Sequence, residues 1–117
     1  MKTILCYSKC STCKKAEKWL KENSLEYQYR AIDKENPTYE ELKDWYAKSE
    51  LPIKRWFNTS GKLYREQNIK EKVGSLSDDE LLKILAQNGM MVKRPIMVAE
   101  NDIVLVGFKE EEWKVLK

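Results

Sequence analysis

Apolar and polar positions follow three different patterns along the first third of this chain. Residues 2–7 form a short run that is apolar on both sides, which is typical of a buried central strand. From Ser11 the apolar positions recur at helical spacing with lysines opposite them, and Asn23-Ser24 is a stop signal. Residues 25–32 alternate with a period of two, which indicates a second strand. The pattern predicts a βαβ unit whose two strands are parallel neighbours in one sheet.

The middle of the chain, from Asp33 to about Val92, is predicted to be helical. Pro52 and Gly61 interrupt it, and Gly89 is expected to end its last helix. Two helices should open with capping boxes, one formed by Thr38 with Glu41 and the other by Ser77 with Glu80. Short helical turns are expected around Trp56, Phe57 and Tyr64.

The strand pattern resumes after Arg94-Pro95. Ile96–Ala99 and Ile103–Val106 are rich in β-branched residues and predict a hairpin. The last residues carry one apolar helical stripe made of Phe108, Trp113 and Leu116. We therefore expect a single α/β domain spanning 1–117, with its core in 1–33 and 92–117 and a helical insertion at 34–91.

Charge and hydropathy exclude several classes of protein. Acidic and basic residues make up 35% of the 117 residues and nearly cancel, leaving a net charge of +3. The basic pairs are dispersed, so we expect no direct nucleic-acid binding. No apolar run has the length of a signal peptide or a membrane span, so we expect a cytoplasmic protein without a membrane partner. We also expect a monomer.

Three cysteines, Cys6, Cys10 and Cys13, lie within eight positions, too close together for a disulfide framework. A zinc site needs four ligands, and the chain has no histidine. The C-x-x-x-C-x-x-C spacing is also that of some iron–sulfur sites, but Cys6 falls inside a predicted buried strand. We therefore expect no bound metal.

Cys10 and Cys13 alone form a C-x-x-C pair at the start of the predicted helix. Unpaired N–H groups and the helix dipole favour a thiolate at Cys10, and Lys9, Lys14 and Lys15 add weaker help. Cys13 lies one turn later on the apolar stripe and should be more buried. We therefore predict that Cys10 attacks and Cys13 resolves the mixed disulfide. The alternative is that both are small buried residues, which is the interpretation we favour for Cys6.

Arg94-Pro95 is the second candidate position. A proline directly before a strand can be cis or can simply begin an edge strand in the trans form, and both fit the sequence. Arg94 could offer a fixed cation to an anionic substrate or a thiolate, or it could be an ordinary surface arginine.

Three segments resemble one family across essentially the whole chain. They are Cys10–Ala16 (CSTCKKA), Phe57–Arg65 (FNTSGKLYR) and Lys93–Ile96 (KRPI). The chain is similar to the ArsC/Spx-like group of thioredoxin-fold proteins. The resemblance implies a glutaredoxin-like, four-stranded mixed sheet with a helical insertion, and a cis Pro95 that brings Arg94 near Cys10. We expect the substrate site to include Lys9, Ser11, Thr12 and Pro95.

Two branches of this group imply different functions. Arsenate reductases use a cysteine and three arginines, whereas this chain supplies Arg94 but has Asn58 and Gly107 at the other two places. Losing two guanidinium groups should weaken oxyanion binding. Spx/MgsR-type regulators use the C-x-x-C as a redox switch and bind the RNA polymerase α subunit, but Pro52 stands where Spx has a glycine. We expect a thiol–disulfide reductase served by glutathione or thioredoxin, with the regulator as the alternative.

Overall fold

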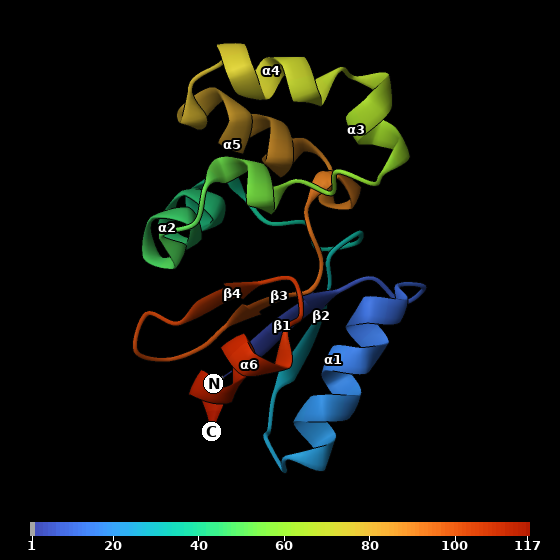
Figure 1. Ribbon diagram of the computed structural model, residues 1–117, viewed down its shortest axis with the longest axis vertical. Coiled ribbons are helices and arrows are strands. Elements are labelled where there is room, and N and C mark those ends of the chain that lie inside the picture. Colours follow the sequence, from blue (N-terminus) through green and yellow to red (C-terminus); the bar gives the residue numbers. More distant parts are fainter. Residues whose placement is uncertain (1) are drawn as a thin grey trace. The chain divides into compact units, whose positions relative to one another are not determined.

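The computed structural model describes residues 2–117 (Figure 1). The chain forms two compact units. The first contains the residues up to Ala31 together with Arg94–Lys117, and the second contains Ile32–Lys93. Both ends of the chain therefore contribute to the first unit.

The first unit is built on a four-stranded sheet with the order β2-β1-β3-β4. Its strands are β1 (Thr3–Cys6), β2 (Gln28–Ala31), β3 (Ile96–Val98) and β4 (Val104–Val106). β1 runs parallel to β2 and antiparallel to β3, and β3 runs antiparallel to β4. The predicted mixed sheet and the parallel βαβ unit are both confirmed.

Helix α1 (Ser11–Glu22) is confirmed, but the strand after it is shorter than predicted. Ser24 has a φ of 55°, and its N–H donates to the Lys21 carbonyl at 3.1 Å. The Leu25 N–H donates to the Leu20 carbonyl at 2.9 Å, which completes a Schellman motif. Because this helix end uses Leu25, β2 begins only at Gln28.

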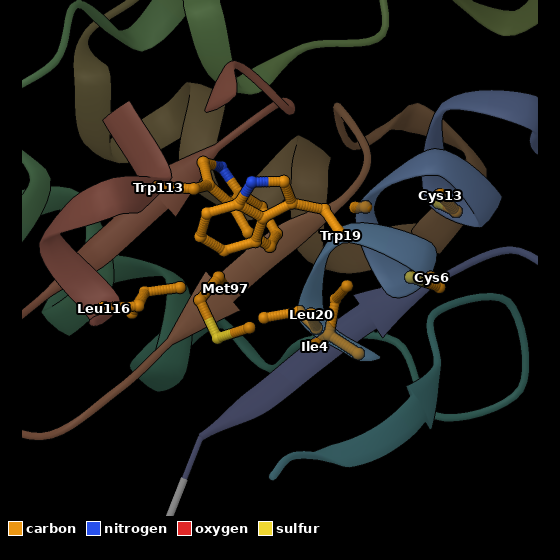
Figure 2. Packing of buried hydrophobic residues seen from close by; sticks show 9 residues of the cluster. Ile4, Cys6, Cys13, Trp19, Leu20, Met97, Trp113 and Leu116 are labelled. Carbon is orange, nitrogen blue, oxygen red and sulfur yellow. The ribbon is translucent and has the colours of Figure 1, made fainter. Parts of the chain in front are cut away.

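One face of the sheet carries the main hydrophobic cluster, seen in Figure 2. The apolar side of α1 packs against β1 and β3, and the C-terminal helical turns close the cluster. Its buried members are Ile4, Cys6, Cys13, Ala16, Trp19, Leu20, Met97, Trp113 and Leu116. The predicted apolar stripes of α1 and of the C-terminus thus meet in one core.

Trp113 anchors the C-terminal turns, which are α6 (Glu110–Trp113) and a 3-10 helix over Lys114–Leu116. Its ring meets Trp19 of α1 edge-on, with centroids 6.3 Å apart. Its Nε1–H donates to the Gly107 carbonyl at 3.0 Å. This acceptor offsets the cost of removing the indole N–H from water.

The predicted β3–β4 hairpin is confirmed and turns through two left-handed residues. Asn101 and Asp102 have φ values of 62° and 60°. Asn and Asp tolerate this conformation better than other non-glycine residues. The Ala99 N–H donates to the Ile103 carbonyl at 2.9 Å and closes the loop.

The second unit is helical, as predicted. The Thr38 capping box is complete, and the Ser77 side chain accepts the Glu80 N–H. Within residues 2–117, no helix is both long enough and apolar enough to cross a bilayer. The helices of this unit are α2 (Tyr39–Ser49), α3 (Lys62–Glu66), α4 (Ile69–Ser75) and α5 (Asp78–Gln87), with 3-10 helices at Ile53–Trp56 and Gly89–Met91.

Gly89 has a different role from the predicted helix stop. Helix α5 ends at Gln87, with Asn88 as the cap, and Gly89 begins the following 3-10 helix. A Cβ on Gly89 would lie 1.9 Å from the Ile32 carbonyl oxygen. Glycine is needed here because two backbone segments pass in contact.

We predict that Trp113→Phe lowers the free energy of unfolding by about 1–3 kcal/mol, because the buried Gly107 carbonyl loses its donor and the core loses ring area. Urea denaturation followed by far-UV circular dichroism measures the change. Val115→Ala is the control, since Val115 is 55% exposed and its truncation should change stability by less than about 0.5 kcal/mol. Equal effects in the two variants would contradict the anchoring role.

Candidate thiol site

Cys10 lies at the junction between β1 and α1. It is the N-cap of the helix, with φ −93° and ψ 117°. Its N–H donates to the Tyr7 carbonyl at 3.0 Å, and its carbonyl accepts the Lys14 N–H at 3.2 Å. The residue is half-buried, so the thiol lies beside the positive end of the helix and remains within reach of solvent.

Cys13 follows one helical turn later and is only 1% exposed. It belongs to the hydrophobic cluster, and Cys10 packs against that cluster from its edge. The pair therefore combines one accessible cysteine at the helix start with one buried cysteine a helical turn later.

Several groups stabilise a negative charge on Cys13. A hydrogen bond from the Cys6 thiol is the largest cause that lowers the pKa of Cys13, and burial opposes it. The Tyr7 backbone, the Cys10 thiol and the Arg94 charge lower this pKa further. The sequence predicts a thiolate at Cys10, because the helix dipole is strongest at the helix start. In the structure, the groups that favour a thiolate act on Cys13.

Arg94 reaches the thiols from the start of β3. Its guanidinium carbon lies 5.3 Å from the centroid of the Tyr7 ring, a cation–π distance. The Arg94-Pro95 peptide bond is cis, as the resemblance implied. The structure thus brings Arg94, Cys10 and Cys13 together, and the buried Pro95 supports the loop by accepting the Gly107 N–H at 2.8 Å.

The other expected substrate-site residues flank Cys10 in the chain. Lys9 and Ser11 are exposed, and Thr12 is half-buried. Lys9 lies on the turn before α1, and Ser11 and Thr12 lie in the first turn of that helix.

The two positions without arginine have their own local roles. Gly107 has a φ of 76°, a conformation that favours glycine over any side chain. Asn58 belongs to the unit Ile32–Lys93, where its backbone N–H donates to the Met91 carbonyl at 2.8 Å. Neither position supplies a cation.

Sequence reasoning missed Tyr7 and the effect of Cys6 on the pKa of Cys13. Tyr7 provides the turn carbonyl for Cys10, a backbone hydrogen bond for Cys13 and the ring beneath Arg94. In the sequence it is only the polar end of an apolar run. Cys6 looked like any small strand residue, because period-two patterning does not show which sulfur faces which.

Among residues 2–117, no three His, Cys, Asp or Glu side chains are arranged to hold a metal ion.

Known proteins are similar to this chain in sequence, and solved structures are similar to it in fold. The uncharacterized protein YusI of Bacillus subtilis is 47% identical over 112 residues, which cover 96% of this chain and 94% of YusI. The global transcriptional regulator Spx 2 of Bacillus anthracis is 32% identical over 103 residues, covering 88% of this chain and 76% of Spx 2. The crystal structure of a putative ArsC family related protein from Bacteroides fragilis superposes with a TM-score of 0.96 at 51% identity, covering 99% of this chain and 97% of that one.

The family model agrees with these similarities. It matches residues 5–116, which include the cysteines, the helical insertion and the Arg94-Pro95 turn. This chain belongs to the ArsC family.

Proposed function

We propose that this protein is a cytoplasmic thiol–disulfide oxidoreductase that uses Cys10 and Cys13 as its redox pair. The observation that carries the proposal is a half-exposed cysteine at a helix start, followed one turn later by a buried cysteine in an anion-stabilising environment. Such environments are typical of reactive rather than structural thiols.

The reaction proceeds in two exchanges. The Cys10 thiolate attacks one sulfur of a disulfide substrate, forms a mixed disulfide and releases the other sulfur as a thiolate. The Cys13 thiolate then attacks Cys10 Sγ, forms the Cys10–Cys13 disulfide and releases the reduced substrate. Two electrons pass to the substrate. Two glutathione molecules, or one thioredoxin-type dithiol, then restore the pair.

In this proposal the two thiols share one negative charge, since the Cys10 thiol is among the groups that lower the pKa of Cys13. When Cys10 attacks, its proton passes to Cys13, and Cys13 gives this proton to the leaving thiolate before it attacks in turn. Interacting thiols titrate as a unit, so the charge belongs to the pair rather than to either sulfur alone. Arg94 stabilises that charge throughout.

Arsenate is not the substrate that this site favours. A multiply charged oxyanion is best held by several guanidinium groups. Of the three positions where the resemblance expects an arginine, this chain has one at Arg94 and none at Asn58 or Gly107. The left-handed backbone at Gly107 disfavours a side chain there. A neutral disulfide, or a singly charged oxidised thiol derivative, requires less positive charge and fits a single arginine better.

A second candidate function is a redox-switched regulator that binds the RNA polymerase α subunit. The observation that favours it is the similarity to Spx 2, which is a global transcriptional regulator. Pro52, where the resemblance gives Spx a glycine, is exposed and precedes the 3-10 helix Ile53–Trp56. Here oxidation of Cys10 and Cys13 would alter a binding surface instead of turning over a substrate.

The redox pair is tested by titrating the protein against glutathione buffers and mapping disulfides by mass spectrometry. We predict one reversible intramolecular disulfide joining Cys10 and Cys13. Cys10→Ser and Cys13→Ser should both abolish it, and the Cys13 variant should instead accumulate a glutathione adduct on Cys10. Independent thiols across the whole range would overturn the proposed function.

The charge on Cys13 is tested by following thiolate absorbance near 240 nm in a Cys10→Ser variant, whose hydroxyl keeps a donor beside Cys13. We predict that this thiolate forms well below the pH at which an ordinary cysteine ionises, because the pKa of Cys13 is lowered. Arg94→Gln should move the transition to higher pH, and Arg94→Lys should move it less. An identical curve for the arginine and glutamine forms would show that Arg94 does not act on this sulfur.

The two candidate functions are separated by a pull-down with the C-terminal domain of the polymerase α subunit. The reductase predicts no retention in either redox state. Retention in one state only would favour the regulator. Pro52→Gly is the matched variant, since a φ of −59° is open to glycine and the change costs only about 1 kcal/mol of stability. Binding gained by this variant alone would show that the surface lacks just that contact.

A further inference from the structure

The proposed exchange uses the charge of Arg94, whose side chain needs something to hold it in place. Arg94 is half-buried and lies in a bend just before β3. The backbone next to it is fixed, because the Pro95 carbonyl accepts the Gly107 N–H at 2.8 Å. The backbone does not fix the side chain, since an arginine has many rotamers and each carries the charge to a different place.

Tyr7 lies opposite Arg94 at the end of the sheet. Strands β1 and β3 run antiparallel side by side (Figure 1), and Leu5 pairs with Ile96 in their register. Continuing this register by two residues places Tyr7 across from Arg94, where the chain leaves β1 toward α1. The two residues are far apart in the sequence and become neighbours because their strands pair.

The ring of Tyr7 contacts the charged end of Arg94. The guanidinium carbon lies 5.3 Å from the ring centroid, within the range of cation–π attraction. A cation–π contact is made to the face of the ring, which has no lone-pair acceptor, so it fixes the charge without replacing the hydrogen bonds of the guanidinium. Tyr7 is half-buried, and the attraction is stronger where water is partly excluded.

The backbone of Tyr7 contacts Cys10. The Tyr7 carbonyl accepts the Cys10 N–H at 3.0 Å, which closes a four-residue turn between β1 and α1. One residue thus contacts Cys10 through its carbonyl and Arg94 through its ring. Any residue at position 7 has the carbonyl, so a substitution there removes the ring and keeps the turn.

We propose that Tyr7 is a positioning residue whose ring holds the Arg94 guanidinium beside the turn that carries Cys10, so that the site favours disulfides with a carboxylate near the reacting sulfur. The inference rests on the proposed redox function of Cys10. A carboxylate attracted by Arg94 brings its neighbouring sulfur toward Cys10, whereas a neutral disulfide gains nothing from that charge. The exchange is the one described above: Cys10 Sγ bonds one substrate sulfur, and the other leaves as a thiolate.

The test compares how fast Cys10 of the reduced protein is alkylated by iodoacetate, which carries one carboxylate, and by the neutral iodoacetamide. The ratio of the two rates reports local charge, because the thiolate fraction of Cys10 affects both reagents equally. We expect Tyr7→Leu to lower the acetate-to-acetamide ratio about threefold, the size of one partly solvated ionic contact. Tyr7→Phe keeps the ring and should stay within about 1.5-fold of wild type. A leucine variant with the wild-type ratio would overturn the proposal.

A double-mutant cycle tests whether Tyr7 acts through Arg94. Arg94→Gln alone should lower the ratio at least as far as Tyr7→Leu does. In the Arg94→Gln background, Tyr7→Leu should change the ratio by less than about 1.5-fold, because no cation is left to position. Two effects that simply multiply would show that the ring acts independently of the arginine, and the proposal would fail.

Tyr29→Leu is the matched control, because Tyr29 lies in the same sheet, opposite Ile4, and is 45% exposed. It should leave the ratio unchanged. If it lowers the ratio as far as Tyr7→Leu does, the effect comes from losing an aromatic residue of the sheet and the inference is wrong. Tyr7→Met is a second variant without a ring, and it replaces Tyr7→Leu if circular dichroism shows that the leucine variant is unfolded.

Exchange rates with two disulfides separate this inference from the proposed function. Oxidised glutathione carries carboxylates, and bis(2-hydroxyethyl) disulfide is neutral. We expect Tyr7→Leu to slow exchange with oxidised glutathione more than exchange with the neutral disulfide, and equal slowing would overturn the substrate preference. If wild type exchanges with neither disulfide, the proposed function and the substrate preference both fail, while the alkylation ratio still decides whether Tyr7 positions Arg94.

Discussion

The packing of α1 on the sheet is the constraint on which the rest of the structure depends. Its apolar face is fixed by the aromatic contact between Trp19 and Trp113 and by Leu20 at the centre of the cluster. With the body of the helix held there, its first turn must begin where β1 ends. The position of Cys10 is therefore set by core residues two to three turns away from it, together with the buried Cys13 one turn away.

A second constraint is that one negative charge has to be stabilised beside a hydrophobic core. Burial disfavours the charge on Cys13, and hydrogen bonds to its sulfur offset that cost. Most of these donors come from the short stretch between the end of β1 and the helix, while Arg94 enters from the other end of the chain. Residues from the βαβ unit and from the segment before the C-terminal hairpin thus both stabilise a charge on Cys13 Sγ.

The fold was largely predictable because its signals are local. The period change at Ser11, the Thr38 capping box and the β-branched runs around Asn101 each specify one element, and the resemblance supplied the sheet. The wrong predictions concern residues whose conformation is set by backbone contacts with other segments. Leu25 was assigned to a strand, but a helix-ending hydrogen bond claims it. Gly89 was assigned to a helix end, but the nearby Ile32 carbonyl is what requires a glycine.

The candidate site was predictable in its members but not in its electrostatics. The C-x-x-C spacing and the Arg94-Pro95 turn identified residues that the structure brings together. Which sulfur collects the donors depends on side-chain directions across β1 and α1, and the backbone contact of Tyr7 has no sequence signature. Such features follow from three-dimensional contacts between segments, so they required coordinates.

The backbone at Gly107 has a consequence for how this protein could change over evolutionary time. Its N–H binds Pro95, its carbonyl receives the Trp113 indole, and its φ of 76° suits glycine. An arginine introduced there would meet a strain of about 1–2 kcal/mol and would disturb the loop that carries Arg94. A gain of arginine at this position would therefore be favoured only together with further changes in the loop that carries Gly107 and Pro95.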